Sequence, residues 1–150
     1  MYKLSSVVWN QDQITSCYFE LQKLEQIMFA AQAKKVSPTL PQLSEELASI
    51  LKNNRMDLST SSLRSLREWL DLVKKRALVI NLVFNTTLTD KHRIELINWF
   101  RDKINPDCLF KISQRSSIGG GFILQTPTNW YDFTFKKIIL NQPLSIIDKA

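Results

Sequence analysis

Side chains able to perform acid–base or nucleophilic chemistry are few in this sequence. His92 is the only histidine among the 150 residues, and it stands between Lys91 and Arg93 at the start of a predicted helix. A Ser/His/Asp or Cys/His arrangement would have to use this one imidazole, and no Gly-x-Ser-x-Gly turn accompanies it. A solvated position on the helix surface is therefore the simpler interpretation of His92. The sequence predicts no catalytic residues, and we expect the protein not to be an enzyme.

Metal and cofactor sites are also poorly supported by the residue types. A structural zinc ion needs about four close ligands, whereas Cys17 and Cys108 lie far apart and only one histidine is present. We interpret both cysteines as free buried thiols in a reducing compartment. Glu45 and Glu46 are adjacent in sequence, so they cannot face each other across a substrate as paired glycosidase acids do. We therefore expect no metal and no cofactor.

All three glycines of the chain, Gly119, Gly120 and Gly121, are consecutive. They separate two apolar runs, 108–112 and 122–124. A glycine run can cradle phosphate, but that motif ends in Gly-Lys-Ser/Thr and opens a helix, whereas Phe-Ile-Leu follows here. Because glycine adopts positive φ without strain, we predict instead a bulge or a tight entry into a strand.

The composition is that of a globular protein with one domain or two very small ones, with 44% hydrophobic and 23% charged residues. The longest apolar run, 77–80, continues past Asn81 to Phe84, far short of the ~20 residues of a membrane span. The first eight residues lack the basic leader and apolar core of a signal peptide. The net charge of +6 is compatible with nucleic acid, anionic lipid or an acidic protein as partner, and also with none.

Helical periodicity dominates the chain up to residue 76. A first helix is predicted from Asn10, which has Gln13 at capping-box spacing, to about residue 35. A second is predicted for 41–53, because Pro41 suits a first helical turn. Residues 1–9 are expected to be extended or frayed.

The third predicted helix has the clearest pattern. Asp57 or Ser59 can cap it, and its apolar stripe is typical of a core face, part of which a partner could share. The stripe consists of Leu63, Leu66, Leu70, Val73 and Ala77. On the opposite side, i,i+4 charge pairs are predicted for Arg64/Glu68, Arg67/Asp71 and Asp71/Lys75.

From residue 77 the pattern changes to alternating strands and helices. The nearly continuous apolar run 77–84 predicts a strand buried on both faces. Thr89 or Asp90 then caps a helix with Ile94, Ile97, Phe100 and Ile104 on one face. Further strands are predicted at 108–113, 121–125 and 129–132, followed by a helix at 133–140. We thus expect an α+β protein: a helical bundle over 1–76 and an α/β unit, β-α-β-β-β-α, over 77–150.

A basic nucleic-acid-binding protein is one functional hypothesis. Aromatic side chains interleaved with basic ones suit the stacking of single-stranded bases, although no sequence motif of a known RNA-binding module is present. The aromatic residues are Phe110, Trp130, Tyr131, Phe133 and Phe135, and the basic ones are Lys111, Arg115, Lys136 and Lys137. Because aromatic residues in short strands are more often core, we do not favour nucleic acid as the partner.

The second half of the chain also carries the motif of a known family. Ile118-Gly119-Gly120 precedes a hydrophobic strand, Asp132 follows at the family's distance, and Thr134 replaces its usual serine. On these residues the chain resembles the delta subunit of F-type ATP synthases, the counterpart of the oligomycin-sensitivity-conferring protein. The resemblance covers about half the chain, 77–140. The sequence departs from the family in lacking Asp-Pro before the motif and in having about 75 N-terminal residues, where the family has a six-helix bundle.

The resemblance implies a non-catalytic peripheral-stalk subunit without a cofactor. Such a subunit joins the catalytic alpha/beta head to the stalk, so that rotation is coupled to ATP synthesis. It implies contacts of Leu63, Leu66 and Leu70 with the N-termini of the alpha subunits, and of Lys136 and Lys137 with the C-termini of the b subunits. It further implies a peripheral membrane protein on the cytoplasmic side of a bacterial inner membrane, or the matrix or stromal equivalent. The stator-like subunit of a related rotary or secretion ATPase is an alternative.

Overall fold

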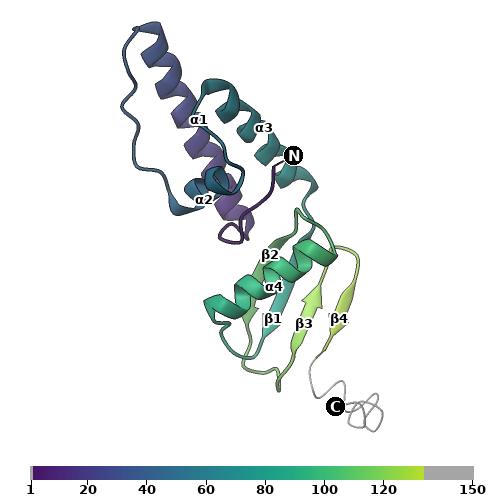
Figure 1. The fold of residues 1–150 in the computed structure, drawn as a ribbon. Helices are drawn as coiled ribbons and strands as arrows, with labels where there is room; N and C mark the ends of the chain where they lie inside the picture. Colours follow the sequence, from purple (N-terminus) through teal and green to yellow (C-terminus); the bar gives the residue numbers. More distant parts are fainter. Residues whose placement is uncertain (1, 134–150) are drawn as a thin grey trace.

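A computed structural model describes residues 2–133 and places a helical region beside a small sheet (Figure 1). The α+β class predicted from the sequence is confirmed, with an N-terminal helical region followed by the strand-containing part. In chain order the elements are α1 (Gln11–Ala33), α2 (Glu45–Asn53), α3 (Thr60–Arg76), β1 (Val79–Phe84), α4 (Asp90–Lys103), β2 (Leu109–Gln114), β3 (Phe122–Gln125) and β4 (Trp130–Asp132).

Capping residues set where the helices begin. The predicted capping box forms at Asn10 and Gln13, and Ser59 caps α3. The second helix begins at Glu45 rather than at residue 41. There the Ser44 hydroxyl accepts the Leu47 N–H, while both the N–H and the hydroxyl of Ser44 donate to Glu20 on α1. This tertiary contact fixes the cap, which the proline alone could not indicate.

The predicted charge pairs along α3 are largely replaced by contacts between helices. Only Asp71 and Lys75 pair as predicted, with 2.7 Å between Oδ2 and Nζ. Arg67 instead donates to Glu25 on α1, and the guanidinium of Arg64 also lies near that carboxylate. The hydrogen bond to Glu25 raises the pKa of Arg67. A mostly buried carboxylate offers a stronger partner than an exposed one on the same helix.

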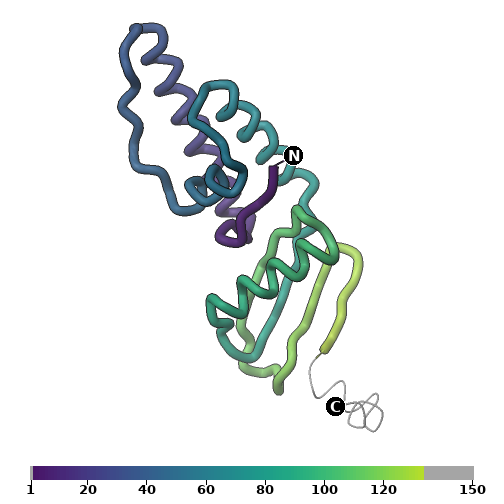
Figure 2. Tube along the Cα trace, in the orientation of Figure 1, coloured from purple at the N-terminus to yellow at the C-terminus, as the bar shows by residue number. Residues whose placement is uncertain are grey.

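The N-terminal segment 2–9 is irregular but not frayed, so the fraying alternative of the expectation for residues 1–9 is wrong. Leu4 and Val8 are buried in the helical core. The Trp9 carbonyl accepts the Phe110 N–H at 2.7 Å, and its indole lies under the Arg93 guanidinium. Figure 2 shows this dark-purple segment passing between the helices and the sheet. It therefore belongs to the contact between the two parts.

The sheet has the strand order β2-β1-β3-β4. The pair β1–β2 is parallel and connected through α4, whereas β1–β3 and β3–β4 are antiparallel. Helix α4 covers one face (Figure 1), where Ile97 and Phe100 pack against Ile80, Leu82 and other core residues. Strand β1 is not buried on both faces as predicted, because its alternate residues on the other face are only half-buried.

Two further sequence predictions concern a membrane-spanning helix and a helix after β4. Within residues 2–133, no helix is long and apolar enough to cross a membrane. The helix predicted at 133–140, with Thr134, Lys136 and Lys137, lies beyond the described residues except for Phe133.

Candidate functional site: a glycine turn and two grooves

The side chains that could perform acid–base or nucleophilic chemistry are dispersed, and the two thiols are unreactive. The exposed His92 places its Nδ1 3.0 Å from the Thr89 hydroxyl that caps its own helix. Burial, followed by the charges of Glu20 and Glu46, raises the pKa of Cys17 to about 12. Burial likewise raises the pKa of Cys108, so both thiols stay protonated near neutral pH. No group of three or more potential metal ligands is found in the stretch 2–133.

The triple glycine forms the turn between β2 and β3. Gly120 has φ of 96° and Gly121 has φ of 76°, so the predicted need for positive φ is confirmed at these two positions. Gly119 has open space where a Cβ would stand and does not share this backbone conformation. Because a strand follows the turn, the helix N-terminus that would hold a phosphate is absent from it.

The two other described motif residues, Ile118 and Asp132, lie toward the same end of the sheet. Ile118 is buried, and its N–H donates to the Arg115 carbonyl. Asp132 is half-buried and pairs in register with Ile123, two residues beyond the turn. The structure thus brings the Ile-Gly-Gly turn and Asp132 together across β3, although they are separated in sequence.

The predicted partner residues of α3 are not on the surface. Leu63, Leu66 and Leu70 are each 0% exposed and pack within the chain's own helical core. Their assignment as core is confirmed, but their assignment as partner contacts needs correction, because a fully buried side chain offers a partner no surface. The predicted contacts Lys136 and Lys137 lie outside residues 2–133.

A shallow groove between α1 and α3 is an exposed surface of the helical region, whereas the three leucines of α3 are buried. Its volume is about 270 Å³, and its lining combines one exposed aromatic side chain with charged groups. Phe29 is 72% exposed there. The lining residues are Gln22, Glu25, Gln26, Phe29, Thr60, Arg64 and Arg67. One signal of this surface is present in the sequence, since Phe29 does not belong to the apolar stripe of the first helix, which consists of Ile14, Tyr18, Leu21, Leu24 and Met28.

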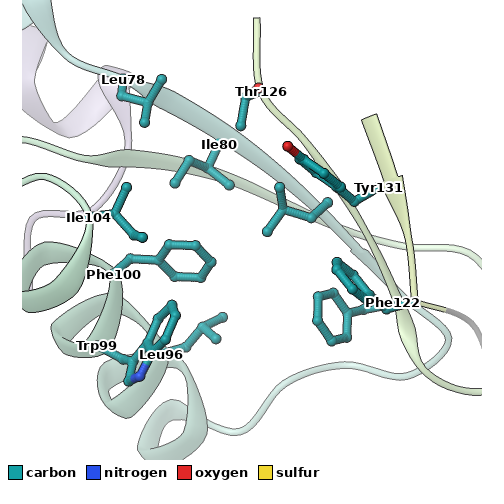
Figure 3. Close-up of a pocket in the computed structure, with 11 residues that line it drawn as sticks. Leu78, Ile80, Leu96, Trp99, Phe100, Ile104, Phe122, Thr126 and Tyr131 are labelled. Atoms are coloured by element: carbon teal, nitrogen blue, oxygen red, sulfur yellow. The ribbon is translucent and has the colours of Figure 1, made fainter. Parts of the chain in front are cut away.

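A second and larger groove of about 460 Å³ lies between α4 and the strands β3 and β4 (Figure 3). Its lining is almost entirely apolar: Leu78, Ile80, Leu96, Trp99, Phe100, Ile104, Phe122, Leu124, Thr126, Tyr131 and Phe133. Of the predicted apolar face of α4, Ile97 and Phe100 are core, whereas Ile104 is exposed in this groove and Ile94 is exposed outside it. Sequence reasoning missed the groove, because its walls come from elements brought together only by the fold.

The aromatic residues considered for nucleic-acid stacking do not share one surface. Phe110 is buried in the sheet core. Tyr131 and Phe133 line the apolar groove, whereas side-chain alternation turns Trp130 toward the opposite face of the sheet. Phe135 lies outside the described part. Within residues 2–133 these rings therefore form no continuous stacking platform.

The candidate features in residues 2–133 are thus a glycine turn, a charged groove on the helices and an apolar groove on the sheet unit. No family model matches this chain, and no curated protein matches it.

Proposed function

We propose that this chain is a non-catalytic peripheral-stalk subunit of an F-type ATP synthase, of the delta kind. The observation that carries the proposal is the placement of the motif residues. Ile118, Gly119 and Gly120 form the β2–β3 turn, and Asp132 lies beside it across β3. The strand-helix-strand order before the turn and the hydrophobic strand after it agree with the family pattern on which the resemblance rests.

The connection between the two parts also supports a mechanical role. A stator subunit transmits torque between a head and a stalk, so its parts must be joined by more than a single linker. Here Arg101 of α4 donates to the carbonyls of Ser5 and Val8, and Trp9 accepts from Phe110. Leu109 of β2 is moreover buried in the helical core. These contacts couple the sheet unit to the helices through buried structure.

The groove between α1 and α3 is the surface we assign to the catalytic head. An amphipathic helix from the N-terminus of an alpha subunit would place an apolar side chain on Phe29. An acidic residue beside it would meet Arg64, whose side chain is largely exposed. This groove replaces Leu63, Leu66 and Leu70 as the proposed contact.

Copurification tests the proposal. A tagged full-length chain, recovered from native membranes in mild detergent, is expected to bring alpha and b subunits with it, identified by mass spectrometry. Phe29→Glu is expected to reduce recovery of the alpha subunit by about tenfold, because one central aromatic contact contributes that much in typical interfaces. The variant should leave the fold intact, since Phe29 is exposed.

Leu72→Glu is the matched control, because Leu72 is an exposed apolar residue of α3 that does not line the groove. It should leave alpha recovery unchanged. Recovery of secretion-ATPase components in place of the alpha and b subunits would indicate a stator-like subunit of a secretion ATPase instead. Salt-sensitive retention of oligonucleotides without any ATPase subunit would overturn the stator proposal altogether.

A further inference from the structure

The sheet unit has an apolar face that is only partly covered. Helix α4 packs over β1 and β2, where Ile97, Phe100 and Phe110 belong to one buried cluster. Phe122 and Leu124 of β3, Tyr131 of β4 and the following Phe133 line the apolar groove. Figure 3 labels Phe122 and Tyr131 on this side of the sheet. Four large apolar side chains remain exposed in the groove: Trp99, Ile104, Tyr131 and Phe133.

The apolar lining of the groove favours an apolar occupant. Thr126 contributes a hydroxyl at its edge, and the lining otherwise consists of aliphatic and aromatic residues without a charged group. A polar metabolite would find few hydrogen-bond partners there, and its burial would be costly. Aliphatic and aromatic side chains, in contrast, would remove the exposed lining from water.

The chain itself supplies such side chains next to the groove. Phe133, the last described residue, lines the groove, and 17 residues follow it. Ile138 and Ile139 follow Phe135 at three and four residues, the spacings typical of one helical face, with Lys136 and Lys137 between them. A helix over 133–140 would be about 12 Å long. Attachment to Phe133 also gives this segment an effective concentration of the order of millimolar at the groove, which a free partner lacks.

We propose that residues 134–147 of the same chain fill this groove, with Phe135, Ile138 and Ile139 against the exposed lining. The segment would thereby cover the apolar lining that α4 leaves exposed. The inference rests on the groove and on the position of Phe133, and it stands whether or not the chain is a stator subunit.

Photo-crosslinking in the full-length chain tests this directly. Replacing Trp99, which is 53% exposed in the groove, with p-benzoylphenylalanine should give crosslinks to residues 135–147 of the same molecule. The control position is Trp130, which is 57% exposed but projects from the opposite face of β4. It should give these crosslinks at a level lower by about tenfold or more, because the sheet separates it from the groove.

Hydrogen exchange of the full-length chain provides a second readout. Trp99→Glu places a charge in the groove and should accelerate exchange in the peptide 134–147 by about tenfold or more, because its docking is weakened. Trp130→Glu should not change that exchange. The proposal is overturned if crosslinks from position 99 join two copies of the chain, if they avoid residues 134–147, or if both glutamate variants behave alike.

Discussion

Replacing Arg101 with methionine is expected to lower the free energy of unfolding by about 3 kcal/mol, the cost of leaving buried acceptors without their donor. Arg101 of α4 links the N-terminal segment to the sheet unit through several hydrogen bonds. Its Nη1 donates to the Ser5 carbonyl at 2.8 Å and its Nη2 to the Val8 carbonyl at 2.6 Å. Its Nε and Nη2 both donate to the Cys108 carbonyl. One planar guanidinium thus holds the N-terminal segment and the start of β2 together.

Methionine retains most of the length of Arg101 but none of its donors, so the carbonyls of Ser5, Val8 and Cys108 lose a charged partner. Burial lowers the pKa of Arg101 to about 10, against the opposing influence of Cys108 and Asp107. The guanidinium therefore remains protonated at neutral pH, where the measurement is made.

Urea denaturation measures the free energy of unfolding of Arg101→Met and of a control variant, Lys103→Met. Lys103 is exposed on the same helix, and its ammonium lies near Asp102 alone. Its replacement should change the free energy of unfolding by less than about 0.5 kcal/mol, as exposed ion pairs usually do. Equal losses in the two variants would show that Arg101 is not the connection we describe.

Replacing Gly120 with valine is expected to destabilise the sheet unit by about 2–3 kcal/mol, because a β-branched residue strongly disfavours positive φ. The φ of 96° at Gly120 lies in the region that only glycine adopts readily. The strain should weaken the β2–β3 connection and leave α1–α3 folded. Hydrogen exchange would then quicken in β2 and β3 while the helical core stays protected.

The control is the neighbouring glycine. Gly119→Ala meets no atom within 4 Å of the new Cβ and needs no positive φ. It should shift the free energy of unfolding by no more than about 0.5–1 kcal/mol, in either direction. If Gly119→Ala were as damaging as Gly120→Val, the strained-backbone explanation of the turn would be wrong.

Local signals in the sequence predicted the elements of the fold well. Asn10 with Gln13 located the first helix, and Ser59 and Thr89 were correct caps, because capping depends on residues only a few positions apart. The change from helical to strand periodicity after residue 76 located β1. The glycine run was correctly interpreted as a strand entry that needs positive φ, because positive φ is a property of the backbone at those residues.

Contacts between distant residues were not predictable in the same way. Arg67 had a plausible partner four residues away, yet it pairs with Glu25, 42 residues earlier. The burial of Leu4 and Val8 depends on two surfaces that exist only after folding. The apolar groove likewise requires β3 and β4 to lie beside α4. A single sequence indicates which residues are apolar, but it does not show which of them the fold leaves uncovered.

We propose that this chain couples the catalytic head of an ATP synthase to its stalk. The most direct measurement is ATP-driven proton pumping in inverted membrane vesicles from cells that lack the chain. We expect ATP hydrolysis to continue without pumping, and the purified full-length chain to restore pumping when it is added back. Pumping that is unaffected by loss of the chain would contradict the claim.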